Sequence, residues 1–442
     1  MTNTIVENIV TNGVLPLIVY EQSLHIYYEG VWYTFDTAEQ ERLALVKPLV
    51  VKSIGKKPTA KEIDAVHAEL KTEYSALESY IDRDEVFINC KDQLLVITKD
   101  GSVSTRPHDS TLGFRWKLKH NYDADATCPL FDKYLREVIG EGEAIAVLQE
   151  YLGYIFLPHN HLNLEMALWL VGSGSNGKSV LTSLLKYVFG EDNVSYLNLP
   201  ELNNDEKRGM LKGKLLNITQ DASNKIDPSS YKTIVSGEKL IFRELYKGSS
   251  VLKSVPKLII ATNDLPRVNT GIDAFMRRVI LIPFNKVITE ENRDLELSHK
   301  LKGEIEGIFN FAIKGLQRLL EQKQFTHSQM IEKAVLEYKG DLDILDDFLQ
   351  DHPIEKLEVR GSDHITQNDL YRKVVEWCQQ CNRKNPYYTA RKLRDKLCSS
   401  HGFSPYKNNT VYGIKGRWKI RASIPAPANN TQAPHPYGCK TK

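Results

Sequence analysis

The eight residues Gly172-Ser-Gly-Ser-Asn-Gly-Lys-Ser179 constrain this 442-residue chain more than any other feature. They match G-x-x-x-x-G-K-[ST], in which glycines let a loop curl so that backbone N–H groups face phosphate oxygens. The apolar run EMALWLVG precedes the pattern and the helical stretch VLTSLLKYVFG follows it. This order predicts a nucleoside triphosphate site, with Lys178 at the β- and γ-phosphates and Ser179 on Mg²⁺. The alternative is a Gly/Ser-rich turn with a solvated lysine. The predicted nucleotide-binding residues are Gly172, Ser173, Gly174, Ser175, Asn176, Gly177, Lys178 and Ser179.

Three further apolar runs, LLNITQDAS, IIATNDLP and RRVILIPF, follow in order, each with polar or basic residues at one end. Helical signals separate them, which predicts an α/β parallel sheet between about residues 160 and 290. Asp221 would hold Mg²⁺ or orient water, and Asn263, beside Asp264, would position water near the γ-phosphate. Arg277 and Arg278 are free to reach a neighbouring subunit's phosphate. Taken singly, each is an ordinary loop residue; the series after a phosphate loop is what favours function.

This series of motifs resembles the superfamily 3 helicases of viruses, phages and plasmids, a branch of the AAA+ ATPases. It is most similar to the phage/poxvirus primase–helicase family, over about residues 80–345. The resemblance implies a hexameric ring that moves on single-stranded DNA, typically 3′ to 5′, with ATP sites between subunits. It also implies roles: Lys178 and Ser179 match the Walker A residues, Asp221 the Walker B acid and Asn263 the sensor. Arg277 or Arg278 matches the arginine finger, and counting back from Phe284 favours Arg277.

Two departures from the family pattern limit the resemblance. Many relatives have two adjacent acids where this chain has Gln220-Asp221, so Asp221 acts alone or Glu238 or another acid supplies the second role. Residues 1–100 show no zinc-finger spacing and no acidic triad for nucleotidyl transfer. The sequence therefore predicts a helicase without primase activity.

Two regions are candidates for DNA contact. EKLIFRELYKGSSVLKSVPKL predicts a hairpin with Tyr246 and Lys247 at its tip, where this helicase class places a channel hairpin; a solvated turn is the alternative. From Arg360 onward, 16 Lys and Arg stand against 4 Asp and Glu, a net of +12, which leaves −10 for the residues before it. Two predicted helices and a hairpin in this basic end suggest a winged helix, with a protein-docking module as the alternative. Its candidate phosphate contacts are Arg391, Lys392, Arg394, Lys396, Lys415, Arg417 and Lys419.

A zinc site is a weaker hypothesis for the same basic end. Cys378-x-x-Cys381 and Cys398-x-x-His401 have suitable spacing, but both pairs lie in or at the end of predicted helices. Cysteine is also a frequent small buried residue, so packing is the simpler interpretation.

Composition sets the remaining limits. With 41% hydrophobic and 26% charged residues the chain can bury large cores, and no apolar run reaches the roughly 18 residues of a membrane span. Its start lacks the layout of a signal peptide, and six cysteines fit a reducing cytoplasm, that of a bacterial host if the chain is phage-encoded. The predicted fold class is α/β: an AAA+ P-loop core with a parallel sheet, a helical collar, a mixed N-terminal domain and a C-terminal winged helix. The predicted domains are 1–105 (N-terminal accessory), 106–160 (helical collar), 161–300 (ATPase core), 301–344 (helical lid or connector), 345–421 (basic winged helix) and 422–442 (disordered tail).

Together these patterns predict an ATP-dependent DNA helicase of phage or mobile-element replication, with ATP and Mg²⁺ as ligands. The expected partners are single-stranded and forked DNA, further copies of the chain in a homo-hexamer, and a separate primase or polymerase; no membrane is expected. One rival is an AAA+ initiator or loader that remodels origin DNA without processive unwinding. A second rival, a P-loop phosphotransferase, would not explain a trans-acting arginine or the basic end.

Overall fold

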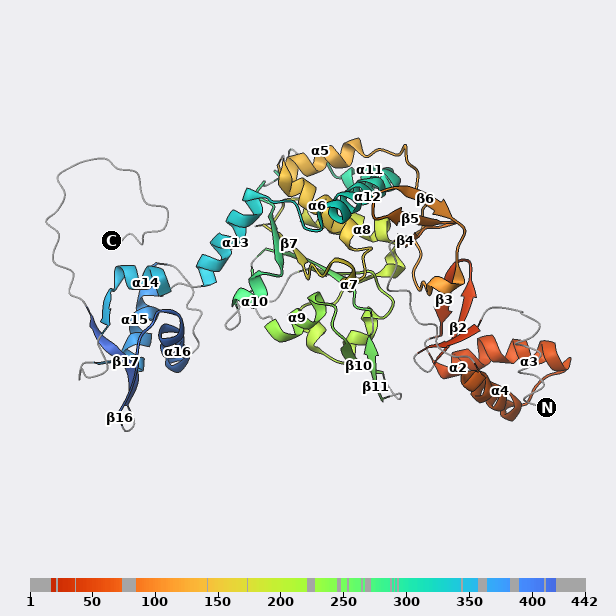
Figure 1. The fold of residues 1–442 in the computed structure, drawn as a ribbon, viewed down its shortest axis with the longest axis horizontal. Coiled ribbons are helices and arrows are strands. Elements are labelled where there is room, and N and C mark those ends of the chain that lie inside the picture. Colours follow the sequence, from red (N-terminus) through yellow and green to blue (C-terminus); the bar gives the residue numbers. More distant parts are fainter. Residues whose placement is uncertain are drawn as a thin grey trace. The chain divides into compact units, whose positions relative to one another are not determined.

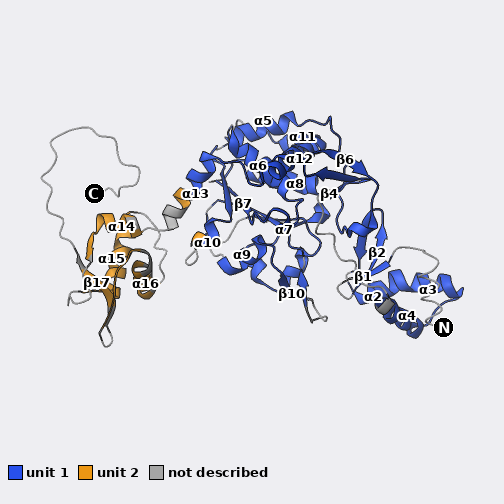
Figure 2. Cartoon of the chain, viewed as in Figure 1, with its two compact units in different colours: residues 1–266, 274–335 blue, residues 267–273, 336–442 orange. Residues whose placement is uncertain are grey.

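The structure is a computed structural model, and it divides into two compact units, residues 1–266 with 274–335 and residues 267–273 with 336–442 (Figure 2). Each unit is described by itself. The residues that the structure describes are 17–20, 23–35, 37–73, 85–140, 142–172, 174–220, 227–244, 248–252, 254–263, 265–266, 272–286, 288–289, 291, 294–342, 345–356, 364–381, 389–408 and 411–418.

A five-stranded parallel sheet forms the centre of the first unit, in the order β13-β7-β12-β9-β8. Figure 1 labels its strand β7. The four strands predicted from apolar runs are all present, and the short β8 at the edge is an addition. Nearly every residue of these strands is buried, as expected for parallel strands covered on both faces. The strands are β7 (Ala167–Val171), β8 (Val194–Ser195), β9 (Leu216–Gln220), β12 (Lys257–Thr262) and β13 (Val279–Pro283).

Three helices that flank the sheet in sequence pack together, as the apolar spacing predicts. They are α5 (Pro129–Val138), α6 (Glu143–Tyr154) and α12 (Ile305–Gln322). The closest approach is between α6 and α12, where a Cβ at Gly315 would lie 2.1 Å from the carbonyl oxygen of Gln149. The predicted apolar positions on α5 and α6 are buried: Phe131, Leu135, Val138, Val147, Tyr151 and Tyr154. On α12, Phe309, Ala312, Leu316 and Leu319 are buried and Ile305 is partly buried.

The described residues between 17 and 106 form two separate three-stranded antiparallel sheets, β1-β2-β3 and β4-β5-β6. The first sheet shares a core with the neighbouring helices. The second sheet belongs elsewhere, because Val86, Ile88, Leu95 and Ile97 lie in the core that contains α5, α6, α12 and the parallel sheet. The boundary expected near residue 105 therefore differs from the division of the cores, which falls before β4. The strands are β1 (Leu17–Tyr20), β2 (Ser23–Tyr28), β3 (Val31–Thr34), β4 (Glu85–Asn89), β5 (Leu94–Thr98) and β6 (Val103–Arg106).

Helical structure over residues 38–54 is an addition to the elements expected from the sequence. Pro48, within a Val-rich run, disfavours the interior of a helix. Glu41–Val46 is nevertheless wound as a π-helix (η1), and α3, Lys47–Ile54, follows it directly with Pro48 in its first turn. The predicted helix over residues 58–81 is present as α4, Ala60–Glu73.

In its described residues, the second unit contains the helices α14 (Leu345–Asp351), α15 and α16 and a four-stranded antiparallel sheet around its own apolar core. The expected helix–helix–hairpin order is present as α15 (Gln367–Gln380), α16 (Ala390–Ser400), β16 (Pro405–Asn408) and β17 (Val411–Trp418). Thr366 caps α15 as predicted, because its side chain accepts a hydrogen bond from the Asp369 N–H. The winged-helix assignment itself stays a prediction.

The remaining elements connect these parts of the chain. They are α2 (Ala38–Gln40), η2 (Ser110–Leu112), α7 (His159–Leu162), α8 (Lys178–Phe189), η3 (Glu191–Asn193), η4 (Glu201–Asn203), η5 (Lys207–Leu211), α9 (Pro228–Val235), β10 (Leu240–Glu244), β11 (Gly248–Leu252), α10 (Ile272–Met276), α11 (Leu297–Lys302), α13 (Gln329–Leu342), α14 (Leu345–Asp351), β14 (Ile354–Lys356) and β15 (His364–Thr366).

Candidate nucleotide-binding site

The glycine-rich loop lies at the carboxyl edge of the parallel sheet, between β7 and α8. In open parallel sheets this edge is where ligands bind. Gly174 and Gly177 have φ of +102° and +90°, and Ser175 has φ of +47°. This left-handed winding needs glycine at most positions and turns successive N–H groups inward, as an anion-binding loop requires. Because α8 begins at Lys178, its amino end adds a positive partial charge at the same place.

The side chain of Lys178 is buried in the loop, only 7% exposed, and is held by oxygen atoms of three residues. Its ammonium donates to the carbonyl oxygen of Gly172 at 2.7 Å, to Asn176 Oδ1 at 3.0 Å and to Asn263 Oδ1 at 3.1 Å. Asn263 follows β12, the strand next to β7, so the strand order brings this residue to the loop. The structure therefore joins two of the residues predicted from separate motifs, Lys178 and Asn263.

A tyrosine that no sequence motif includes also contacts the loop. The Tyr134 hydroxyl on α5 donates to the carbonyl oxygen of Gly177 at 2.8 Å. Burial raises the pKa of this phenol, so it stays protonated and remains a donor. No local signal marks Tyr134, because its partner lies 43 residues further along the chain.

The two adjacent arginines before β13 have different surroundings. Arg277 is exposed and makes no hydrogen bond or ion pair with the described residues. Arg278 is 2% exposed, and its guanidinium bonds Glu165 at 2.6 Å, the Ala274 carbonyl at 2.8 Å and Ser236 at 3.3 Å. A side chain held in this way is not available to a neighbouring subunit, so the assignment of Arg278 as a possible finger is corrected and Arg277 remains the candidate.

Several predicted site residues lie outside the described residues: Ser173, Asp221, Tyr246, Lys247, Asp264 and Lys419. Their roles stay predictions. Gln220, just before Asp221 in the sequence, ends β9 and donates through its amide to the Thr182 hydroxyl of α8 at 3.2 Å. Glu238, the alternative second acid, instead forms an ion pair with Lys232 at 3.6 Å. Ser179 lies in the first turn of α8 and is exposed.

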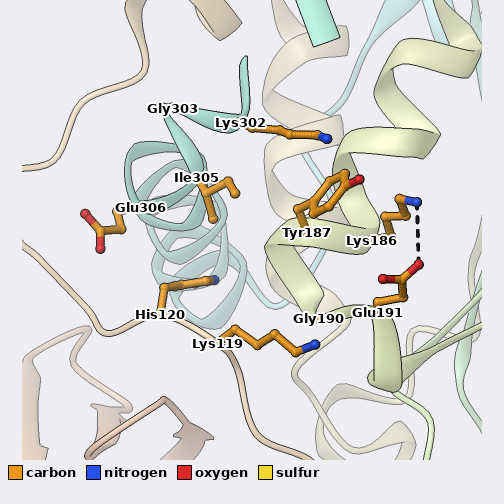
Figure 3. Close-up of a pocket in the computed structure, with 10 residues that line it drawn as sticks. All are labelled: Lys119, His120, Lys186, Tyr187, Gly190, Glu191, Lys302, Gly303, Ile305 and Glu306. Carbon is orange, nitrogen blue, oxygen red and sulfur yellow. Dashed lines mark ion pairs between the residues drawn. The ribbon is translucent and has the colours of Figure 1, made fainter. Parts of the chain in front are cut away.

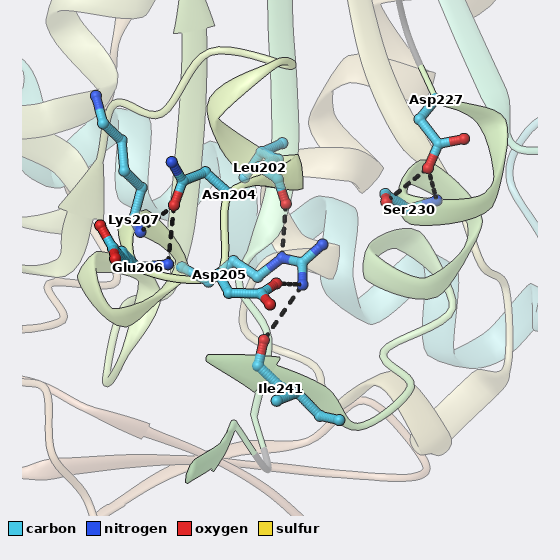
Figure 4. A network of polar contacts seen from close by, with 9 residues as sticks. Leu202, Asn204, Asp205, Glu206, Lys207, Asp227, Ser230 and Ile241 are labelled. Carbon is cyan, nitrogen blue, oxygen red and sulfur yellow. Dashed lines mark hydrogen bonds and ion pairs between the residues drawn. The ribbon is translucent and has the colours of Figure 1, made fainter. Parts of the chain in front are cut away.

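The predicted DNA-contacting hairpin is present as β10 paired with β11, and a partly buried arginine fixes its base. The Arg208 guanidinium donates to the Leu202 carbonyl at 2.7 Å, to the Asp205 carboxylate and to the Ile241 carbonyl at 3.3 Å (Figure 4). The Arg243 N–H adds a bond to the Asp205 carbonyl at 3.0 Å. These contacts fix β10 to the segment over residues 202–208.

A cavity of about 450 Å³ lies at the other end of α8 and is distinct from the loop. Lys186 forms an ion pair with Glu191 at 3.5 Å, and the Lys302 ammonium lies 4.1 Å from the centroid of the Tyr187 ring (Figure 3). A hydrogen bond from Lys302 lowers the pKa of this phenol. Because lysines stabilise the negative carboxyl end of a helix, these contacts have a structural explanation. The cavity is lined by Lys119, His120, Lys186, Tyr187, Gly190, Glu191, Lys302, Gly303, Ile305 and Glu306.

Among the predicted phosphate contacts of the basic end, the structure describes the side chains of Arg391, Arg394 and Lys415. The Arg391 side chain is 80% exposed. The Arg394 side chain is only 14% exposed and is held by Asp395 at 2.8 Å and Gln367 at 3.3 Å, which corrects its assignment as an available phosphate contact. Lys415 is half-buried and lies on β17, and the side chains of Lys392, Lys396 and Arg417 are outside the described part.

The three cysteines among the candidate zinc ligands lie in or against the apolar core of the second unit. Cys378 is buried within it, and Cys381 and Cys398 pack against it. Burial raises the pKa of the Cys398 thiol, which disfavours the thiolate that zinc requires. Within the described ranges, no three His, Cys, Asp or Glu side chains are grouped as metal ligands. Cys378 and Cys398 are free thiols that pack in or against this core, whereas Cys381 is disulfide-bonded.

Comparison with known proteins gives matches in both halves of the first unit. Residues 18–140 match the family described as "D5 N terminal like", and residues 170–278 match DUF5906, a family of unknown function. "Putative helicase L207/L206" of Acanthamoeba polyphaga mimivirus is 26% identical over 280 residues, which is 56% of this chain and 28% of that protein. "Putative helicase 121R" of Invertebrate iridescent virus 3 is 22% identical over 306 residues, 60% of this chain and 32% of that protein. The matched region thus spans about a third or less of these relatives.

A solved structure agrees with the fold over nearly the whole length. The apo C-terminal region of NrS-1 superposes with a TM-score of 0.52 at 16% identity and covers 93% of this chain and 98% of that one. A second structure of this region gives a TM-score of 0.51 at 14% identity. The family match at residues 18–140 and the two viral relatives support a resemblance to the phage and viral primase–helicases.

These matches confirm the resemblance drawn from the motifs. Along the chain, the DUF5906 match runs from β7 through the loop to Arg278 and so contains most of the predicted ATPase motifs. None of the helices in the described ranges is both long and apolar enough to cross a lipid bilayer.

Proposed function

We propose that this chain is an ATP-dependent DNA helicase of phage or mobile-element replication. The observation that carries the proposal is the buried ammonium of Lys178, held inside a left-handed glycine loop and bonded to Asn263 from the neighbouring strand. This pairing of a phosphate-binding cation with a water-positioning amide is what hydrolysis of a triphosphate requires. The resemblance to primase–helicases and the helicase names of the viral relatives favour DNA as the substrate.

The residues present fit a magnesium–triphosphate ligand. The inward-turned N–H groups of residues 174–178 and the amino end of α8 would receive the phosphate oxygens, and Lys178 would exchange its present oxygen partners for them. Ser179 and Asp221 would hold Mg²⁺, which supplies charge neutralisation at the β- and γ-phosphates. Asn263 would orient the attacking water, and Arg277 would reach the phosphates bound by the adjacent subunit.

On this proposal the active form is a homo-hexameric ring that moves 3′ to 5′ on single-stranded DNA. The hairpin of β10 and β11, with Tyr246 and Lys247 at its tip, would follow the strand, and the basic second unit would add phosphate contacts. A separate primase or polymerase is the expected partner. An AAA+ initiator or loader is the second candidate, since the same ATP site and basic end would serve it.

ATP hydrolysis by the purified chain, with single-stranded DNA added, tests the proposal. Lys178→Ala should reduce turnover to background, because the loop retains no other cation for the β- and γ-phosphates. The matched control is Lys186→Ala, a lysine on the same helix two turns further on, which should keep wild-type turnover. Wild-type chain without DNA-stimulated hydrolysis, or a Lys178→Ala variant that keeps it, would refute the assignment.

A further inference from the structure

Asn176 occupies one of the unspecified positions of the loop motif, yet its side chain does not face the open side of the loop. It is 2% exposed and makes hydrogen bonds to two different segments. Its Nδ2 donates to the Phe284 carbonyl, just after β13, at 3.1 Å, and its Oδ1 accepts from the Lys178 ammonium at 3.0 Å. One amide thus joins the phosphate-binding lysine to the neighbouring strand.

The chemistry of these two partners fixes the orientation of the amide. A carbonyl only accepts and an ammonium only donates, so Nδ2 must face Phe284 and Oδ1 must face Lys178. Aspartate has the same shape but cannot donate to the carbonyl, and alanine makes neither bond. Among the side chains of this size, only asparagine satisfies both partners.

The surroundings leave no freedom for another arrangement. A Cβ at Gly172 would lie 2.1 Å from Asn176 Nδ2 and 2.4 Å from the Phe284 carbonyl oxygen, so the first glycine of the motif is required by this contact. The Phe284 N–H donates to the Val171 carbonyl at 2.6 Å, and the Ile288 N–H donates to the Ser175 carbonyl at 2.8 Å. Phe284 and Ile288 therefore hold the loop by hydrogen bonds along one side. The Asn176 side chain connects Phe284 to Lys178.

We propose that Asn176 is a positioning residue that holds Lys178 at the phosphate site and ties it to the end of β13. The inference rests on the proposed nucleotide site, since it concerns how that site is kept ready for the triphosphate. It gives the amide an indirect role: Asn176 sets affinity through Lys178 and not through a phosphate contact of its own. Effects on nucleotide binding should then depend on the presence of the lysine.

A double-mutant cycle tests this dependence. The probe is the non-hydrolysable analogue AMP-PNP with Mg²⁺, and the readout is the rise in Tm at millimolar concentrations, which reports affinities into the millimolar range. Asn176→Ala should weaken binding about tenfold in the wild-type background, as expected for a hydrogen bond to a charged group. In the Lys178→Ala background the same change should weaken binding by less than about twofold. Asn176→Asp should weaken binding further than Asn176→Ala, because its carboxylate neutralises the lysine.

Asn193→Ala is the matched structural control. Asn193 is 4% exposed and lies just beyond the opposite end of α8, where its amide donates to the carbonyl oxygens of Phe189 at 2.7 Å and Lys117 at 2.9 Å. This variant should lower the Tm without ligand and leave the affinity unchanged. Two results would overturn the role of Asn176 and leave the proposed function standing. One is an equal loss of AMP-PNP affinity on Asn176→Ala with and without Lys178. The other is a loss of affinity no larger than that caused by Asn193→Ala. No AMP-PNP response from the wild-type chain would overturn the proposed function as well.

Discussion

At the scale of single residues, neighbours in the sequence separate into different roles according to what surrounds them. Arg277 and Arg278 are adjacent, yet one is exposed and the other is fixed by Glu165, Ser236 and Ala274. The motif predicts that an arginine stands before β13, and only the tertiary contacts decide which one is available. The same holds for Arg394, whose place on a basic helix predicted availability that its bonds to Asp395 and Gln367 remove.

Lys257 is a buried lysine that we expect to lower the stability of the folded chain. It begins β12, is 3% exposed, and its ammonium lies 3.9 Å from the centroid of the Tyr154 ring with no hydrogen-bond partner among the described residues. Burial holds the pKa of this amine well below its usual value. We expect Lys257→Met to raise the free energy of unfolding at pH 7 by about 1 to 3 kcal/mol, because it removes a buried polar group without a partner.

Urea unfolding at pH 7 and pH 9 provides the measurement. Since the folded pKa lies below the unfolded value, the unfolded chain binds a proton that the folded chain does not, and wild-type stability rises with pH toward the unfolded pKa. The advantage of Lys257→Met should therefore shrink at pH 9. Lys239 is exposed, so Lys239→Met serves as the control. It should change neither the free energy of unfolding at pH 7 nor its dependence on pH. A less stable Lys257→Met variant would show that the cation–ring contact outweighs the desolvation of the amine.

At the scale of elements, α5 connects the helical part of the first unit to the phosphate loop. The Glu304 carboxylate, just before α12, accepts hydrogen bonds from the Leu130 and Phe131 N–H groups at 3.0 and 2.9 Å and so caps α5 from another segment. At the next turn Tyr134 bonds Gly177. The loop conformation thus depends on how α5 is held.

Tyr134→Phe should raise the KM for ATP about two- to tenfold, the range expected for loss of one hydrogen bond. The Tm should change little, because the Gly177 carbonyl still accepts from the Val180 N–H at 2.8 Å and the ring stays in place. Steady-state hydrolysis and thermal unfolding measure the two quantities. Tyr151→Phe is the control: its hydroxyl donates to the Leu258 carbonyl at 2.6 Å, away from the loop, so the KM should not move. Equal KM values for wild type and Tyr134→Phe would show that the hydrogen bond from α5 to the loop does not affect ATP binding.

The elements also show what the sequence can predict and what it cannot. The strands β7, β9, β12 and β13 and the helices α5, α6 and α12 follow from local hydrophobic patterns, and the loop follows from its glycines. The bonds that assemble the site, such as Tyr134 to Gly177 and Lys178 to Asn263, join residues 43 and 85 positions apart. They depend on strand order and helix packing, which no local pattern encodes. The helix with Pro48 in its first turn has no clear local signal, because proline disfavours the interior of a helix.

At the scale of the whole molecule, the proposed helicase requires ATP sites that are shared between subunits. Arg277→Ala subunits should bind ATP but hydrolyse it slowly, and Lys178→Ala subunits should fail to hydrolyse it. In mixtures shown to form joint rings, some interfaces combine an intact loop with an intact arginine, so part of the activity should return. ATPase titrations of one variant into the other measure this recovery. Mixed rings without any recovery would mean that Arg277 does not act across the interface.

Strand displacement on forked DNA measures whether ATP hydrolysis at Lys178 drives strand separation. Forks with a 3′ tail and forks with a 5′ tail are each incubated with wild-type chain and with Lys178→Ala, with and without ATP. We expect the wild-type chain to displace the strand of the 3′-tailed fork when ATP is present. We expect no displacement without ATP and none by Lys178→Ala. Robust ATP hydrolysis without displacement of either fork would contradict the proposed helicase function and would favour an initiator that binds and remodels DNA.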